Sequence, residues 1–393
     1  MNILIISQRF WPEGGGGTLA TYVITRLLAN EQTLNISVIT GTRNPLHIEN
    51  VKFIIDPILM SPNKAELLLN FLRPTVRQYY KELIRRFDVV YIPYGYPVIP
   101  IAKELDKRVI VHAHDYQLIS YNSTIIQGQP NNFLRNFAEE MKYELAEYNS
   151  IERAIIGSIL TPMVWTFRSW ASKADMIICV SKRQYEIICK IAPELASKLR
   201  IIYNPAPEVP LVKKELKGAF FMYLGGDSYI KGFHVLIRAS QKFLKKGLRA
   251  TFMLAGTYRI LSTRFAEKLG ESYKILGHLS HEDVLKLYSQ CLALLFPSIT
   301  EEPLPYAVIE AMLTGTLPIA TKVGGIPEIV QGTYAEYLLF TPGDLNEMVD
   351  KMELVASLSK EQLIDIGFKL REEVFKKFDN KLIKHQYLKV FGV

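Results

Sequence analysis

The feature that most constrains the fold is a repeated alternation between short apolar runs and longer helical segments. Runs of four to six apolar residues without polar alternation predict strands that are buried on both faces of a sheet. The segments between them, such as residues 20–31 and 281–291, place their apolar residues at helical spacing. This alternation predicts parallel, doubly wound α/β sheets. The predicted strands are 2–7, 36–40, 88–92, 109–114, 175–180, 220–224, 251–255, 292–296, 317–320 and 337–340.

The chain divides near residues 204–210, where three prolines occur in seven residues. Proline continues neither a helix nor a central strand. A chain of 393 residues also exceeds the roughly 250–300 residues at which single cores stop growing. We therefore predict one Rossmann-like domain over residues 1–203 and a second over residues 204–365.

The composition is that of a globular protein, with 49% hydrophobic and 22% charged residues. Three cysteines in apolar runs favour a reducing compartment over a disulfide framework. No run of about 18 apolar residues occurs and no secretory leader precedes the first strand, so we expect a cytoplasmic protein. The net charge of +8 is compatible with an anionic ligand, a membrane surface or nucleic acid, and does not choose among them.

Two glycine-rich loops follow predicted strands. Residues 12–18 contain Gly16 and Gly17 directly before a helix, where a backbone without side chains and a helix N-terminus suit an anion. The alternative is a flexible strand-to-helix loop. Residues 225–232 contain Gly225 and Lys231, and a lysine at the edge of a parallel sheet suits a diphosphate, although an isolated lysine in a turn is usually only a surface residue.

The most specific motif spans residues 296–330. Prolines at 303 and 305 exclude a helix across the first part, so Glu302 lies on a loop and Glu310 inside a helix that starts near Tyr306. The free N–H groups of Leu304 and Tyr306 would then face a ligand of the loop. Two glutamates on a helix are normally solvated, but Glu310 stands among small and apolar residues. Carboxylates here would accept hydrogen bonds from sugar hydroxyls.

In these motifs the sequence resembles the family 4 retaining glycosyltransferases of the GT-B fold, in which two Rossmann-like domains face each other across a cleft. The resemblance lies in Pro297-Ser298, in Glu302 and Glu310 with seven residues between them, and in the Gly-Gly-x-Pro-Glu sequence at 324–328. Upstream, Lys231-Gly232 and His114 match the family pattern. One position departs from it, because Gly226 stands where the family usually has an arginine on the donor diphosphate.

The resemblance implies a retaining hexosyltransferase that moves a sugar from a nucleotide-sugar donor to a glycan or lipid-linked acceptor. It implies no separate cofactor, no nucleic-acid partner, and a C-terminal helix, residues 366–393, that returns to the first domain. Glu310 would bind the donor ribose, Glu302 the transferred sugar and Lys231 the leaving diphosphate. Gly16 and Gly17 would let the first domain close over the phosphates, and His114 would line the sugar pocket.

Two other functions remain open: a module that binds a nucleotide sugar without transferring it, and a nucleotide-sugar epimerase of the same fold. The loss of arginine at Gly226 favours the first of these. We expect no metal site, since no Asp-x-Asp occurs at a strand end. His112 and His114 have a metal-like spacing, but we expect their side chains to face opposite ways.

Four basic residues recur every fourth position in residues 71–86, at Arg73, Arg77, Lys81 and Arg85. On a helix starting at Pro74 they form one stripe. Such a stripe would hold the enzyme to the inner face of an anionic membrane. The competing interpretation, which we slightly favour, is a solvated helix face whose apolar side packs on the sheet.

Overall fold

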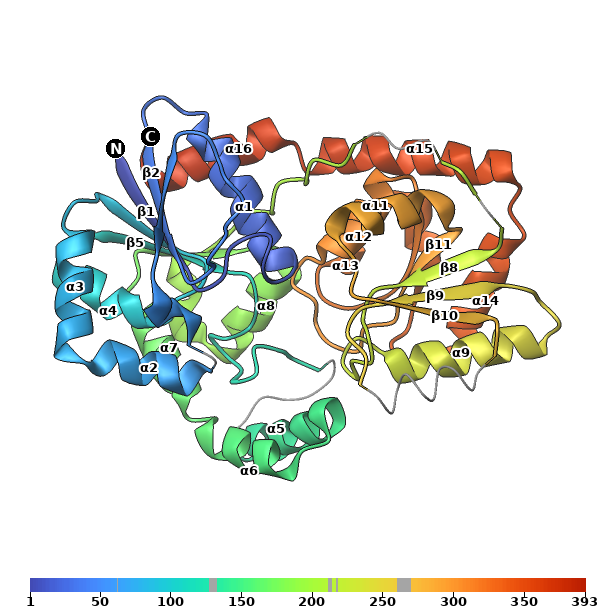
Figure 1. Ribbon diagram of the computed structural model, residues 1–393, viewed down its shortest axis with the longest axis horizontal. Helices are drawn as coiled ribbons and strands as arrows, with labels where there is room; N and C mark the ends of the chain where they lie inside the picture. Colours follow the sequence, from blue (N-terminus) through green and yellow to red (C-terminus); the bar gives the residue numbers. More distant parts are fainter. Residues whose placement is uncertain (62, 127–132, 211–213, 217, 260–269) are drawn as a thin grey trace.

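The computed structural model shows two α/β domains side by side, each built on an all-parallel sheet (Figure 1). It describes residues 1–61, 63–126, 133–210, 214–216, 218–259 and 270–393, with the side chains of 133–136 left aside. This architecture is the predicted one.

The first domain holds a seven-stranded sheet in the order β3-β2-β1-β4-β5-β6-β7. Its strands β1 and β4 are almost entirely buried, as continuous apolar runs require. The strands are β1 (Asn2–Ser7), β2 (Asn35–Thr40), β3 (Val51–Ile55), β4 (Val89–Ile92), β5 (Arg108–Ala113), β6 (Met176–Cys179) and β7 (Leu199–Ile201). The helices are α1 (Gly16–Ala29), η1 (Pro57–Met60), α2 (Lys64–Leu72), α3 (Pro74–Ile84), η2 (Tyr96–Val98), α4 (Ile99–Glu104), α5 (Phe133–Tyr148), α6 (Ile151–Leu160), α7 (Met163–Ala171), α8 (Lys182–Ile191) and η3 (Pro193–Lys198).

The second domain holds a six-stranded sheet in the order β10-β9-β8-β11-β12-β13. Its strands are β8 (Phe220–Tyr223), β9 (Thr251–Ala255), β10 (Tyr273–Gly277), β11 (Ala293–Phe296), β12 (Leu317–Thr321) and β13 (Leu339–Phe340). Its helices are α9 (Phe233–Lys245), α11 (His281–Gln290), α12 (Tyr306–Leu313), α13 (Ile326–Val330), η4 (Tyr334–Leu338) and α14 (Leu345–Ala356).

Three strands escape the sequence prediction: β3, β7 and β10. Each lies at the edge of its sheet. An edge strand is paired on one side only and carries polar residues, as Lys52, Arg200 and Lys274 show. The search for continuous apolar runs therefore misses them.

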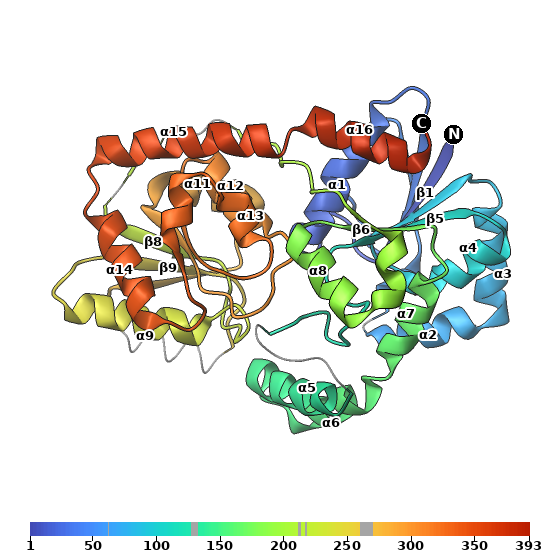
Figure 2. The same ribbon diagram turned by 180° about the vertical axis from the view of Figure 1, so that it is seen from behind.

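Two C-terminal helices, α15 (Lys360–Lys377) and α16 (Asn380–Phe391), form a strap along one side of both domains (Figures 1 and 2). Helix α15 packs on α12 of the second domain, and α16 on α1 of the first. The approach of α15 is close, since a Cβ on Gly367 would lie 2.5 Å from the carbonyl oxygen of Gly315. From the sequence we expected residues 366–393 to return to the first domain. Within that segment, α16 contacts α1.

The strand order places the binding edges of both domains. In each sheet the order reverses at its first strand, between β1 and β4 and between β8 and β11. Ligands of doubly wound sheets bind beyond the carboxyl ends of the strands at such a switch point. The loops after β1, β8 and β11 carry the three motifs found in the sequence.

Candidate active site

Lys231 is positioned by a tight loop between β8 and α9. A Cβ on Gly225 would lie 2.1 Å from the hydroxyl of Tyr223, so only glycine lets the chain fold back at this point. Gly232 closes the loop with φ +76° and caps α9. The Lys231 side chain is 37% exposed, and its ammonium donates to Glu302 Oε1 at 2.7 Å.

Glu302 lies on the loop after β11, as predicted. Its carboxylate is nearly buried, and Oε1 also accepts from the hydroxyl of Ser298 at 2.8 Å. The Pro297-Ser298 step therefore orients the carboxylate toward Lys231. In this arrangement a partly exposed cation and a held carboxylate meet at the switch point of the second sheet.

Glu310 lies inside α12, which begins at Tyr306 as predicted. It is 5% exposed, and His281 Nε2, at the start of α11, donates to its Oε1 at 2.7 Å. This hydrogen bond to Glu310 raises the pKa of His281 above its usual value. The indole of Trp11, from the first domain, meets the His281 ring edge-on at 5.2 Å. The sequence prediction did not include His281.

The N-terminus of α12 faces the first turn of α1 in the first domain, where Gly16 and Gly17 lie instead of in the loop before the helix as predicted. The first N–H groups of a helix have no partner within it and carry a partial positive charge. A Cβ on Gly16 would lie 3.5 Å from the Cβ of Tyr306 and 3.8 Å from its backbone nitrogen. The structure therefore brings Gly16 and Tyr306 together, and Leu304, two residues before Tyr306, is buried.

His114 follows β5 and lies against the same glycine-rich segment. Its ring stacks on Tyr94 with centroids 5.6 Å apart, and a hydrogen bond of 3.2 Å joins its Nε2 to Thr21 Oγ1. A Cβ on Gly17 would lie 2.2 Å from the Tyr94 hydroxyl, so glycine makes this approach possible. Burial lowers the pKa of His114 to about 3, which keeps the ring neutral at physiological pH.

The expectation that His112 and His114 face opposite ways is wrong. Their ring centroids lie 3.9 Å apart. Side chains two positions apart on a strand share a face, which accounts for this contact. In the part of the chain that the structure describes, no group of three or more His, Cys, Asp or Glu side chains is arranged to hold a metal ion.

A hollow of about 790 Å³ opens beside the glycine-rich segment of residues 12–18, between the domains. Tyr94 lines it, and His278 reaches it from the second domain. The start of α2, at Lys64, forms part of its wall together with Met60.

Gly226, where the family resemblance implies an arginine, has no room for a side chain. Its φ is +60°, and a Cβ there would lie 2.3 Å from the carbonyl oxygen of Thr257. The loop after β9 thus occupies the space that an arginine would need. The departure seen in the sequence is built into the packing of two neighbouring loops.

Two glutamates of the third motif hold the domains together, a role that the sequence does not reveal. Glu328 accepts hydrogen bonds from the backbone N–H groups of Lys182 and Arg183 and so caps α8 of the first domain. Glu301, which is buried, pairs with the Arg183 guanidinium. Their partners lie more than a hundred residues away, and no local pattern marks them.

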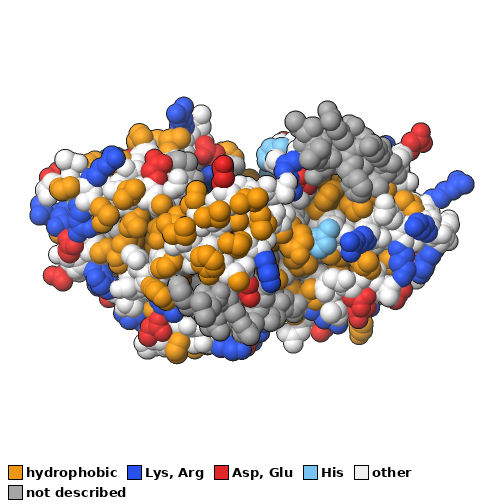
Figure 3. Space-filling model, turned by 90° about the horizontal axis from the view of Figure 1, so that it is seen from below, with side chains coloured by type: hydrophobic (Ala, Val, Ile, Leu, Met, Phe, Trp, Pro, Cys, Tyr) orange, Lys and Arg blue, Asp and Glu red, His pale blue; other side chains and the backbone are white. Residues whose placement is uncertain are grey.

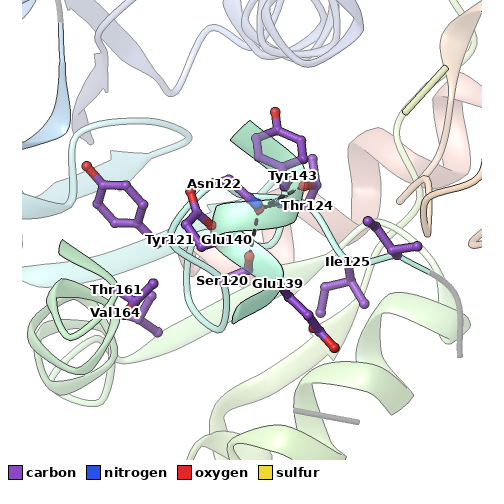
Figure 4. Close-up of a pocket in the computed structure, with 11 residues that line it drawn as sticks. Ser120, Tyr121, Asn122, Thr124, Ile125, Glu139, Glu140, Tyr143, Thr161 and Val164 are labelled. Carbon is purple, nitrogen blue, oxygen red and sulfur yellow. Dashed lines mark hydrogen bonds between the residues drawn. The ribbon is translucent and has the colours of Figure 1, made fainter. Parts of the chain in front are cut away.

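A second, small cavity of about 50 Å³ lies away from this site, among the 120–126 loop, α5 and α7 (Figure 4). The Glu140 side chain lines it, only 3% exposed, and its Oε1 has no partner among the described atoms. Burial, and then the nearby charge of Glu144, raise the pKa of Glu140 to about 7. The native state therefore holds a proton here that the unfolded chain loses near pH 4.5.

We predict that Glu140→Gln stabilises the protein at about pH 8 by about 3 kcal/mol and not at about pH 5. Because the folded-state pKa is raised, stability falls as pH rises from 4.5 to about 7, and glutamine removes that loss. Urea unfolding of both proteins at both pH values measures it. Exposed Glu152→Gln is the control and should show no such pH-dependent gain. Equal stability of Glu140→Gln and wild type at the higher pH would contradict the buried charge.

The fold and this site together define a two-domain glycosyltransferase of the GT-B type. Two family models match the chain: Glycosyltransferase Family 4 over residues 14–207, and Glycosyl transferases group 1 over residues 218–357. The chain belongs to this family of glycosyltransferases.

Three proteins are similar to this chain in sequence or in structure. An uncharacterized glycosyltransferase of Methanocaldococcus jannaschii is 28% identical over 39% of this chain and 44% of its own length. One component of the human phosphatidylinositol N-acetylglucosaminyltransferase is 20% identical over 84% of this chain and 63% of its own length. The chain thus spans less than two thirds of these curated relatives. The solved structure of Anabaena HepE in complex with UDP and glucose superposes with a TM-score of 0.68 at 17% identity, covering 100% of this chain and 99% of that one.

Proposed function

We propose that this chain transfers a sugar from a nucleotide-sugar donor to a glycan or lipid-linked acceptor, with retention at the anomeric carbon. The observation that carries the proposal is the Lys231–Glu302 pair on the loop that leads into α12, together with the buried Glu310 inside that helix. A cation and free backbone N–H groups suit a diphosphate, and two held carboxylates suit hydroxyl groups.

In the proposed reaction Lys231 and the start of α12 stabilise the negative charge that develops on the leaving diphosphate. Glu302 accepts hydrogen bonds from hydroxyls of the transferred sugar, and Glu310 accepts them from the ribose. His281 holds Glu310 until the donor arrives. The neutral His114 ring lines the sugar pocket, and the hollow beside it receives the acceptor.

A thermal-shift screen across nucleotide sugars tests the donor, because a ligand of the native state raises the unfolding temperature by mass action. UDP sugars come first, since the Anabaena structure contains UDP. A donor that raises the transition is then offered with candidate acceptors. The anomeric proton signal of the product in NMR distinguishes retention from inversion. Absence of any shift across uridine, guanosine and adenosine diphosphate sugars would oppose the proposal.

The glycine at 226 favours one further candidate, a module that binds the donor without transferring the sugar. The same screen separates the two. Binding with neither transfer nor slow donor hydrolysis would identify the module, and conversion of the donor without acceptor into its epimer would identify an epimerase.

We also predict that activity survives a chelator. The positive charge beside the proposed diphosphate site comes from Lys231 and the helix N-terminus, which a chelator does not remove. Initial rates with excess EDTA should stay within about twofold of the untreated rate under single-turnover conditions, where product release is not measured. Complete loss of activity that added Mg²⁺ restores would contradict metal independence.

A further inference from the structure

The underside of the first domain carries a large apolar surface that no described part of the chain covers. It consists of exposed side chains from α2, α6 and α7, which we call the lower apolar face. In Figure 3 hydrophobic side chains gather across the left half and centre of this view. The lower apolar face consists of seven side chains that are between 48% and 71% exposed: Leu69, Leu72, Ile151, Ile155, Ile156, Ile159 and Trp165. A contiguous patch of this kind marks an interaction surface.

Helix α6 shows that this exposure follows from its residue pattern. Its small residues, Ala154, Gly157 and Ser158, face inward and are buried. A Cβ on Gly157 would lie 3.2 Å from Glu140 Oε1, so α6 packs closely on α5. The isoleucines point outward instead. A helix that buries its small residues and exposes its large aliphatic ones has the reverse of the usual pattern, so its outer side requires an apolar partner.

The segment from Ala154 to Trp165 contains no charged residue. Helix α7 continues the face, and α7 and α2 both pack on η2. No helix in the described ranges is long and apolar enough to cross a bilayer. The helices that form the face are α2, α6 and α7, of nine, ten and nine residues.

Charge around the face complements an anionic surface. Residues 64–86 hold six lysines or arginines against two glutamates. In the basic stripe of α3, Arg77 and Lys81 both pair with Glu104, while Val76, Tyr80 and Ile84 are buried. The solvated interpretation of the stripe thus holds for its middle. Arg73 and Arg85 remain exposed at the ends of α3, beside Arg86.

The face also leads to the candidate active site. Helix α2 begins at Lys64, which lines the hollow between the domains, and ends at Leu72 on the face. From Lys64 to Leu72 the nine residues of α2 span eight rises, or about 12 Å. Met60, which is exposed, lines the hollow as well. A molecule anchored in a bilayer would therefore reach the hollow along α2.

From these observations we infer that the lower apolar face docks on an anionic lipid bilayer, with α6 and Trp165 in the headgroup region. The basic residues at the ends of α3 contact the lipid headgroups. Docking does not depend on sugar transfer, although it would bring the proposed enzyme to a lipid-linked acceptor.

Co-sedimentation of the whole chain with vesicles tests the inference. Wild type should sediment with phosphatidylglycerol–phosphatidylcholine vesicles and less with phosphatidylcholine alone. Changing Ile155, Ile156 and Ile159 together to Gln should lower the partition coefficient at least about tenfold. The matched control changes Leu354, Phe368 and Leu382 to Gln, which are similarly exposed on α14, α15 and α16, and should bind as wild type does. Changing Arg73, Arg85 and Arg86 to Gln should weaken binding most at low salt.

Tryptophan fluorescence gives a second readout. Addition of anionic vesicles should shift the emission to the blue, and Trp165→Phe should remove most of that shift. Hydrolysis of a soluble donor should be unchanged in the isoleucine variant, so a failure of docking is distinguishable from a failure of the proposed transfer. Equal sedimentation of wild type and the isoleucine variant would overturn the inference. So would a wild type that ignores vesicles but forms a dimer in light scattering that the isoleucine variant loses.

Discussion

Replacing Lys231 by alanine is expected to lower turnover by about two orders of magnitude or more. The leaving diphosphate gains negative charge as the bond to the sugar breaks, and Glu302 holds the Lys231 ammonium at that edge of the second sheet. Because Gly226 provides no side chain, no second cation at that position helps Lys231 to stabilise the leaving diphosphate. The loss should therefore appear mainly in kcat, measured with saturating donor and acceptor.

The alanine variant should remain folded. Lys231 lies in a loop and is partly exposed, and Glu302 keeps its hydrogen bond from Ser298. Thermal unfolding checks this, and Lys231→Arg, which keeps the charge, should recover part of the activity. Lys242→Ala is the matched control, since that lysine is exposed on α9 and its ammonium contacts Asn346. Wild-type turnover in folded Lys231→Ala would exclude the assigned role.

The second large effect concerns Glu302 and Glu310, whose substitutions should lower different quantities. Glu310→Gln is expected to weaken donor binding about tenfold to a hundredfold, because a charged hydrogen-bond acceptor for the ribose is lost. Glu302→Gln is expected to lower kcat about a hundredfold with a smaller change in affinity, because its partner is the reacting sugar. Calorimetric titration of the donor and single-turnover rates measure the two quantities separately.

A control variant distinguishes the contact of Glu310 with the nucleotide sugar from the contact of Glu310 with His281. His281→Gln keeps an N–H group that can donate a hydrogen bond to the Glu310 carboxylate. The affinity of this variant for the nucleotide sugar should therefore fall less than that of Glu310→Gln. Glu336→Gln, which changes an exposed glutamate on η4, should leave both quantities unchanged. Full affinity and full rate in both glutamate variants would contradict the paired-carboxylate interpretation.

Much of the fold could be predicted from local pattern. Buried parallel strands such as β1 and β11 read as continuous apolar runs, and Pro74 and Pro305 mark where α3 and α12 begin. The loops that carry Lys231 and Glu302 follow predicted strands, so their place at a sheet edge could be predicted as well. These features depend on neighbours in the chain, which the sequence displays directly.

The sequence did not predict features that depend on contacts between segments far apart in the chain. His281 becomes the partner of Glu310 only when α11 packs beside α12, and Glu328 caps a helix of the other domain. The exposed side of α6 is apolar because small residues, not large ones, pack on α5. A hydrophobic pattern alone does not say which side of such a helix is buried.

The sequence was therefore sufficient for the order of the elements, the two parallel sheets and the motifs at their edges. Local conformation depends on residues a few positions apart, and the buried or turn-forming character of each segment is written in its own residues. The tertiary structure decided which charges pair, which glycines admit no side chain and which apolar surface stays uncovered. Those outcomes depend on contacts between segments far apart in the chain, and their free energies arise only when the segments pack.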